Sequence, residues 1–111
     1  MKLLTKELRE KLPPLYATED EEDPMLVCKF FHSRSNWTWY AIEFDGEDLF
    51  FGLVEGHVAE LGYFSLRELE AFSDAWALGI ERDRHFKPVP LSEVLEGWPY
   101  EHDYRDDGGK T

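Results

Sequence analysis

The fold is decided by the stretch "SNWTWYAIEFDGEDLFFG", residues 35–52. Aromatic and branched residues, which favour β-strands, lie on both sides of a polar segment around Gly46. This arrangement predicts a β-hairpin. A four-residue turn over residues 45–48 would pair Phe44 with Leu49, whereas a two-residue Asp-Gly turn would pair Phe44 with Glu47. Because the longer turn pairs two apolar residues, we expect the longer turn.

The first strand of this hairpin carries apolar side chains on both faces. The two-residue period of a strand places Trp37, Trp39 and Ala41 on one face. The other face carries Thr38, Tyr40, Ile42 and Phe44. Large aromatic side chains dominate burial, so we expect the two tryptophans to pack in the core or against a second layer. An exposed aromatic platform is the alternative.

Further helices and strands flank the hairpin. Leucines at helical spacing predict a helix within residues 3–12, which Thr5 caps if the helix starts late. Ser65 and Glu68 form a capping box for a second helix from residue 66. The other expected elements are strands over residues 25–32, 49–56, 59–65 and 80–88, the last at a sheet edge, and a helical turn over residues 92–95.

This order of elements predicts an α+β protein. We expect an antiparallel sheet of four or five strands, with two or three short helices packed mainly on one face. Residues 1–98 are expected to form a single domain, and residues 99–111 a frayed polar tail. The single cysteine, Cys28, and the lack of a secretory signal predict a cytoplasmic protein. No apolar run approaches the roughly 20 residues of a membrane span.

Charge is the most unusual property of the composition. The chain has 24 acidic and 12 basic residues, which gives a formal net charge of −12. Residues 1–17 carry +2 and residues 18–111 carry −14. Direct binding to nucleic acid is disfavoured, because phosphate contacts require clustered Lys and Arg. A basic protein partner is favoured instead, and the alternative is that the acids only keep the protein soluble.

Several segments, taken together and in order, resemble the domain-of-unknown-function family DUF2958. They are "LLTKELREKLPPLYA" (3–17), "KFF" (29–31), "NWTWY" (36–40), "FFG" (50–52), "ELGYFSLRELE" (60–70), "IERD" (80–83) and "PLSEV" (90–94). The resemblance covers the chain up to about residue 95 and implies no activity and no catalytic residue. It implies a setting on bacterial plasmids and integrated mobile elements, beside anti-restriction, replication and DNA-processing proteins.

Enzymatic chemistry has weak support. Glu43 and Asp45 are two strand positions apart, which places two carboxylates about 7 Å apart on one face, as a divalent metal or an acid–base pair requires. Such spacings arise by chance when 24 of 111 residues are acidic. The chain lacks a phosphate loop, a zinc-protease motif and a dinucleotide-binding turn. We expect no enzymatic activity, no metal and no cofactor; a metal-dependent hydrolase that uses strand-end carboxylates is the alternative.

Cys28 and the residues around His102 are two further candidates for a chemical role. Cys28 is a nucleophile only if a histidine reaches it, and a cysteine on a strand is usually a small core residue. The histidines are His32, His57, His85 and His102. His102 with Asp103, Asp106 and Asp107 resembles a metal cluster, but a flexible tail would lose conformational entropy on binding.

The main functional hypothesis is a non-enzymatic acidic accessory protein of a mobile element that binds a basic host protein. Duplex DNA carries one charge per roughly 1.7 Å of its axis, so rigidly displayed carboxylates can occupy a site built for phosphates. A DNA mimic that inhibits a DNA-binding or defence protein is the specific form of this hypothesis. The binding residues that we expect are Glu19, Asp20, Glu21, Glu22, Asp23, Glu43, Asp45, Glu47, Asp48, Glu55, Glu60, Trp37 and Trp39.

Three subsidiary expectations concern the acidic segments and the first helix. Residues 19–23 repel one another and lack apolar periodicity, so we expect a solvated, mobile loop. Neutralising the turn acids Asp45, Glu47 and Asp48 should abolish partner binding without lowering stability. The bases of the first helix, Lys2, Lys6 and Arg9, dock either on the acidic body of the protein or on the acids of a partner.

Overall fold

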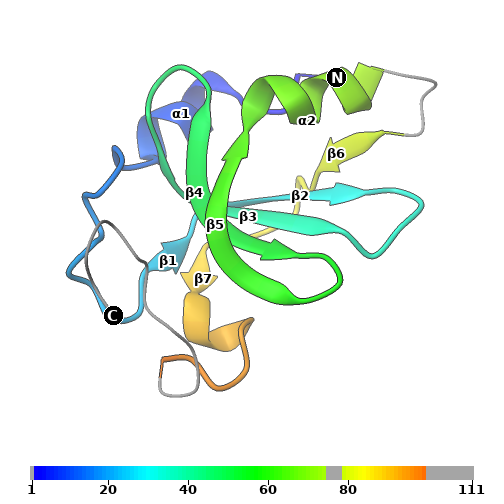
Figure 1. Cartoon of the computed structure of the whole chain (residues 1–111). Helices are drawn as coiled ribbons and strands as arrows, with labels where there is room; N and C mark the ends of the chain where they lie inside the picture. The colour runs from blue at the N-terminus through cyan, green and yellow to red at the C-terminus, as the bar shows by residue number, and fades with distance from the viewer. Residues whose placement is uncertain (1, 75–78, 100–111) are drawn as a thin grey trace.

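In the computed structural model the described residues, 2–74 and 79–99, are organised around a five-stranded antiparallel sheet (Figure 1). Its strands are β2 (Cys28–His32), β3 (Thr38–Phe44), β4 (Leu49–Glu55), β5 (Ala59–Ser65) and β6 (Ile80–Arg82), in the order β5-β4-β3-β2-β6. Consecutive hairpins join β2 to β5, and β6 pairs with β2 at the edge. The α+β class and the edge strand are confirmed, although β6 ends at Arg82, well before residue 88.

A second sheet has two strands, β1 (Met25–Leu26) and β7 (Val89–Pro90). The single strand predicted over residues 25–32 is therefore wrong. The chain passes from one sheet to the other at Val27, whose N–H donates to the carbonyl of Ala41 at 2.8 Å. The side chains on either side of this break, Leu26 and Cys28, consequently belong to different cores.

The helix caps follow the sequence closely. Helix α1 (Lys6–Lys11) begins after Thr5, whose Oγ1 accepts the N–H of Leu8 at 3.1 Å. Helix α2 (Leu66–Asp74) begins after Ser65, whose Oγ accepts the N–H of Glu68 at 3.2 Å. Thr5 and Ser65 are confirmed as N-terminal caps, because each side-chain oxygen satisfies a backbone donor of the first turn. The capping box predicted for α2 is only half formed, because the carboxylate of Glu68 does not accept a hydrogen bond from the N–H of Ser65. The last helical turn is the 3₁₀-helix η1 (Leu91–Glu93).

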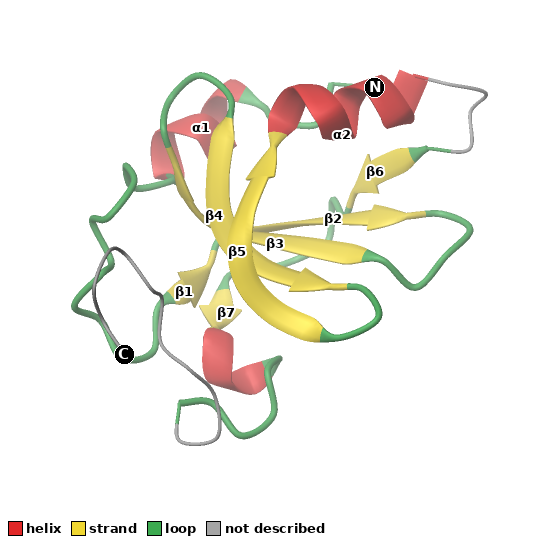
Figure 2. Ribbon diagram, viewed as in Figure 1, coloured by secondary structure: helices red, strands yellow, loops and turns green. Residues whose placement is uncertain are grey.

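Apolar residues cover both faces of the large sheet. Figure 2 shows α1 and α2 on one side of the strands and the short helix η1 on the other. The helix side is the first core, which contains Phe30, Ala41, Phe50, Phe64, Leu66, Leu69 and the N-terminal Leu3, Leu4 and Leu12. The opposite side is the second core, which contains Tyr40, Ile42, Leu53, Leu91, Leu95 and Trp98. The prediction of helices mainly on one face is confirmed, and the sequence did not predict that the C-terminal segment covers the other face.

A β-bulge interrupts the pairing of β3 with β4. Ala41 lies opposite Gly52, but the next pair is Glu43 with Phe51, so Ile42 is an extra residue on β3. The extra residue moves Phe44 to the first core, the face of Ala41, where the sequence had placed it on the opposite face. The predicted pairing of Phe44 with Leu49 is also wrong, because Phe44 pairs with Phe50.

Candidate functional site

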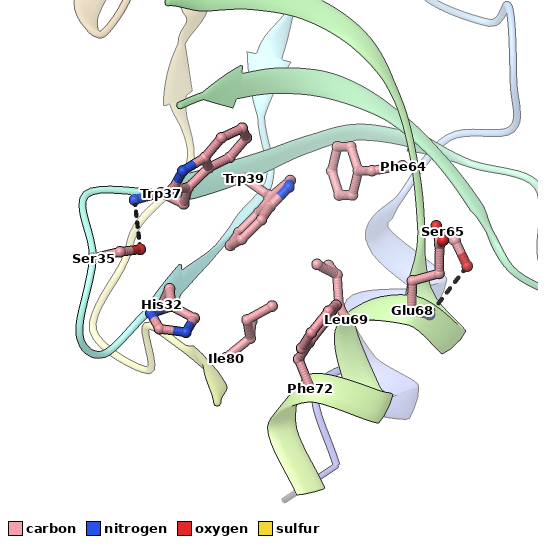
Figure 3. Close-up of a pocket in the computed structure, with 10 residues that line it drawn as sticks. All are labelled: His32, Ser35, Trp37, Trp39, Phe64, Ser65, Glu68, Leu69, Phe72 and Ile80. Carbon is pink, nitrogen blue, oxygen red and sulfur yellow. Dashed lines mark hydrogen bonds between the residues drawn. The ribbon is translucent and has the colours of Figure 1, made fainter. Parts of the chain in front are cut away.

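An apolar pocket of about 520 Å³ lies between β3 and α2, on the first-core face of the sheet (Figure 3). Strand residues form one wall and helix residues the other, and Trp39, Phe64 and Leu69 point toward the same space, with Ser65 and Glu68 at its rim. The lining residues are His32, Ser35, Trp37, Trp39, Phe64, Ser65, Glu68, Leu69, Phe72 and Ile80. A volume of this size lies within the ~300–1,000 Å³ range typical of ligand sites. The fold thus brings together residues of β2, the β2–β3 turn, β3, β5, α2 and β6.

The two tryptophans form the strand wall of the pocket. The rings of Trp37 and Trp39 stack with centroids 6.0 Å apart. Trp37 also lies against Gly56, where an added Cβ would be 2.4 Å from the indole, and its ring meets the edge of His57 at 5.8 Å. Trp37 is 38% exposed and Trp39 is half-buried. They are therefore neither wholly in the core nor a flat exposed platform.

The opposite wall belongs to α2. Leu69 is buried, whereas Phe72, one helical turn later, is 63% exposed although it lines the pocket. Residues three apart lie on the same helix face, so both side chains can face the strands. An exposed phenylalanine beside a half-open aromatic pocket is a feature that protein contacts often use.

Four polar side chains line the pocket, and three of them have partners. Ser35 accepts the N–H of Trp37 at 3.2 Å, and Ser65 donates to Asp48 at 2.8 Å. The Nδ1 of His32 accepts the N–H of Arg34 at 3.2 Å. The carboxylate of Glu68 makes no hydrogen bond or ion pair with any residue in the described part of the chain. Glu68 is therefore available to a ligand.

Glu43 is the one charged residue that the described fold buries completely, at 0% exposure. Its carboxylate accepts the N–H of Tyr16 at 2.8 Å, the N–H of Thr18 at 3.0 Å and the hydroxyl proton of Thr18. The prediction of Glu43 as a surface binding residue is wrong, and so is its pairing with Asp45 on one exposed face. Its role is to fix the segment that leads into the acidic residues.

The acidic loop, residues 19–23, is held in place rather than free. Hydrogen-bonded turns continue from the Glu43 contact, with the N–H of Glu21 donating to the carbonyl of Thr18 at 2.9 Å. At the other end Asp23 accepts the N–H and the hydroxyl proton of Ser92, at 2.9 and 2.6 Å. The indole of Trp98 donates to the carbonyl of Glu22 at 2.6 Å. The expected exposure of all five acidic side chains is observed, and hydrogen bonds hold both ends of the segment that we expected to be a mobile connector.

The acids of the β3–β4 turn are partly structural. One oxygen of Asp45 accepts the N–H groups of Glu47, Asp48 and Leu49, at 2.8, 2.8 and 3.0 Å. Asp48 accepts the Ser65 hydroxyl and the N–H of Arg67, both at 2.8 Å, at the start of α2. Neutralising these residues removes such contacts, so we expect a loss of stability in place of the unchanged stability that the sequence suggested.

The pH dependence of Asp45 follows from these contacts. Hydrogen bonds from the backbone of Asp48 and Glu47 hold the pKa of Asp45 below its ordinary value. Because the pKa of Asp45 is lower in the folded state, the ionised carboxylate stabilises the fold at pH values above the unfolded-state pKa, near 3.8. This stabilisation is lost as the pH falls through the folded-state pKa. Asp45→Ala is expected to lower the free energy of unfolding by about 1–2 kcal/mol at pH 7. Urea unfolding at pH 7 and below pH 3 checks this, and a difference from wild type that does not shrink in acid contradicts it.

The two remaining predicted acids lie at the β4–β5 end of the sheet. Glu55 accepts the hydroxyl proton of Tyr40 at 3.3 Å. Burial, followed by the charge of Glu55, raises the pKa of Tyr40 to about 12. Glu60 is exposed and pairs with Val54, whose side chain packs against the first core. Directly paired residues share a face, so Glu60 lies on the pocket side of the sheet.

Cys28 is a buried core residue. It is 3% exposed, and burial raises the pKa of its thiol to about 12 despite the nearby Arg82. It lines the inner side of a smaller cavity of about 300 Å³ beneath α1. The thiolate, which is the reactive form, is therefore scarce at neutral pH. The interpretation of Cys28 as a packing residue agrees with this environment.

A thiol-labelling experiment tests this description of Cys28. At pH 8 the native protein is expected to react with a bulky aromatic disulfide reagent at least a hundredfold more slowly than the same protein in urea. The reason is that both the access and the ionisation of the thiol are lost on folding. Equal rates for native and unfolded protein would show that Cys28 is accessible.

Arg9, on the first helix, contacts the β3–β4 hairpin of the same protein. Its guanidinium donates to the carbonyl of Gly46 at 2.8 Å and lies 5.1 Å from the centroid of the Phe44 ring. Of the two alternatives for this helix, docking on the protein itself is the one observed for Arg9. Lys2 and Lys6 remain exposed.

Residues 2–74 and 79–99 contain neither a metal-binding group of side chains nor a helix that could span a membrane. No group of three or more His, Cys, Asp or Glu side chains is placed to hold a metal ion there. None of the helices in these ranges is long and apolar enough to cross a membrane. The possible metal cluster around His102 lies outside the described residues, and so does the expected tail over residues 99–111 apart from Pro99.

The fold and the pocket define a small, acidic α+β protein with an aromatic-lined pocket on one face of an antiparallel sheet. The chain belongs to the family described as protein of unknown function (DUF2958), whose model matches residues 3–97. The resemblance drawn from the sequence segments is thereby confirmed. No curated protein and no solved structure is significantly similar to the chain.

Proposed function

We propose that the chain is a non-enzymatic binding protein that recognises a basic protein through the acidic loop, residues 19–23. The observation that supports this proposal is that five consecutive exposed acids lie in a segment that hydrogen bonds hold at both ends. Glu43 fixes the chain before the loop, and Ser92 and Trp98 fix its end. Like charges that repel one another are thus kept together by the fold.

Such an arrangement favours binding for two physical reasons. A loop that is already ordered loses little conformational entropy when a partner binds. The charge of −14 on residues 18–111 also attracts a basic surface over a distance and speeds its encounter with the loop. The second effect is specific to a positively charged partner.

The proposed partner is a protein with a Lys/Arg-lined groove, of the kind that binds nucleic-acid phosphates. The acidic loop would occupy this groove and exclude nucleic acid from it. In the setting that the family resemblance implies, a mobile element would gain from blocking a host defence or DNA-processing protein in this way.

A capture experiment with matched variants tests the proposal. Asp20, Glu21 and Glu22 are exposed, and among the described residues their carboxylates have no partner. Immobilised wild-type protein is expected to capture a basic host protein at low salt and to release it at moderate salt. The loop variant D20N/E21Q/E22Q is expected not to capture it. Its free energy of unfolding should stay within about 0.5 kcal/mol of wild type, because the substitutions are at the surface.

The control variant is E7Q/E10Q/E81Q, which removes three exposed charges from α1 and β6, outside the acidic loop and its anchors. It changes the net charge by the same amount and should retain the partner. Equal loss of the partner from both variants would mean that the acids act only as a general coat. Retention of the partner by the loop variant would remove the loop from the proposal.

A further inference from the structure

The pocket between β3 and α2 is not explained by the acidic loop. In Figure 1 the chain that leads into β1 lies at the left, whereas the β2–β3 turn and the end of α2 lie at the right. The loop and the pocket are therefore separate surfaces. The pocket combines stacked Trp37 and Trp39 on one wall with the exposed Phe72 on the other.

The lining of the pocket specifies the chemistry of its occupant. Aromatic and aliphatic walls favour a large apolar side chain, since burial contributes roughly 25 cal/mol per Å² of apolar surface. Glu68 also lines the pocket, and its carboxylate makes no hydrogen bond or ion pair with any described residue. Glu60 adds a second carboxylate on the same face of the sheet. The occupant should therefore carry a positive charge beside its apolar group.

A second copy of the chain is a poor occupant. Each copy has a formal charge of −12, so a contact through this face brings two strongly acidic molecules together. A basic polypeptide has the opposite property, because its Lys and Arg side chains meet Glu68 while its apolar side chain enters the pocket. Interfaces commonly place such an apolar anchor in a pocket and surround it with polar contacts.

We infer that this pocket is a second binding site, which accepts one large apolar side chain of a Lys/Arg-rich polypeptide segment, with a neighbouring cation paired to Glu68. The inference goes beyond the proposed function, because it adds an apolar contact on another surface. Its choice of a basic occupant rests on the proposed function. Aromatic walls can also stabilise the cation through their ring faces.

Lysine-rich peptides provide the test. The first peptide has one central phenylalanine, the second has alanine in its place, and the third keeps the phenylalanine but has glutamate for every lysine. The indole N–H signals of the full chain, assigned by single Trp→Phe substitutions, report the two surfaces separately. Trp37 and Trp39 report the pocket, and Trp98, which donates to Glu22, reports the acidic loop.

The phenylalanine peptide is expected to shift the signals of Trp37 and Trp39 and to bind at least tenfold more tightly than the alanine peptide. Phe72→Ala and Glu68→Gln should each reduce this binding several-fold. Their controls are Val58→Ala, an exposed apolar residue outside the pocket lining, and Glu10→Gln on α1. Neither control should change the affinity.

Several results would overturn the inference. They are equal affinity of the phenylalanine and alanine peptides, equal binding of the glutamate peptide, or equally tight binding of the free amino-acid derivative N-acetylphenylalanine amide. Shifts of Trp37 and Trp39 that depend only on protein concentration would identify a second copy as the occupant and overturn it too. Binding of the alanine peptide at Trp98 alone would support the proposed function and reject the pocket. Binding at Trp37 and Trp39 without any response of Trp98 would support the pocket and count against the loop.

Discussion

Glu43→Ala is expected to lower the free energy of unfolding by about 3–5 kcal/mol, because it empties a fully buried site and leaves three part-buried hydrogen-bond donors without an acceptor. The donors are the N–H groups of Tyr16 and Thr18 and the hydroxyl of Thr18, which now share one carboxylate. Each unsatisfied buried donor costs about 1–3 kcal/mol. Urea unfolding measures the loss, and faster hydrogen exchange at Tyr16 and Thr18 would locate it.

Two further variants define the contribution of Glu43. Glu43→Gln keeps the shape but turns an amide N–H₂ group toward backbone donors, so we expect an intermediate loss. Glu60→Ala makes the same change as Glu43→Ala at an exposed strand position and should cost less than about 0.5 kcal/mol. A loss below about 1 kcal/mol for Glu43→Ala would contradict its role as an anchor.

Gly52→Ala is expected to cost about 3 kcal/mol, although it adds only one methyl group. A Cβ at this position would lie 1.8 Å from the carbonyl oxygen of Tyr40 and 2.9 Å from its carbon. Both atoms belong to the backbone of β3 at the bulge, so no rotamer change can relieve the contact. Thermal and urea unfolding of the variant measure the effect.

Gly62 is the matched control for Gly52. The two glycines pair directly across β4 and β5, but nothing lies within 4 Å of a Cβ placed at Gly62. Gly62→Ala should therefore be neutral, or should stabilise the protein by up to about 1 kcal/mol through the reduced entropy of the unfolded chain. Similar losses for both variants would show that β3 and β4 are not held so closely.

Local sequence patterns predicted most of the elements. The alternation around Trp39 and the polar segment at Gly46 predicted the central hairpin, and Thr5 and Ser65 predicted where two helices begin. These features depend on residues a few positions apart. Local patterns therefore indicated the elements well but gave little information about how distant segments meet.

The features that the sequence did not predict depend on contacts between distant segments. The bulge at Ile42 is a feature of the pairing between β3 and β4, and it places Phe44 on the first-core face of the sheet instead of the opposite face. The burial of Glu43 depends on donors at Tyr16 and Thr18, which lie far away along the chain. The pocket is assembled from β2, β3, β5, β6 and α2, so no single motif could indicate it.

The acidic residues consequently divide into two groups. Glu43, Asp45, Asp48 and Asp23 accept hydrogen bonds that hold loops and helix starts in place. The exposed carboxylates of residues 19–22 extend into solvent from a segment that those contacts fix. Composition alone cannot separate the acids that hold the fold from the acids that extend into solvent, because both contribute equally to the net charge.

Calorimetric titration with oligolysine tests the central claim most directly, because it compares the acidic loop with an equal charge elsewhere. At one fixed salt concentration, D20N/E21Q/E22Q is expected to bind at least tenfold more weakly than wild type, a difference of about 1.4 kcal/mol. The control E7Q/E10Q/E81Q should remain within about threefold of wild type, or less than about 0.7 kcal/mol. Equal weakening of both variants would contradict a preformed recognition loop.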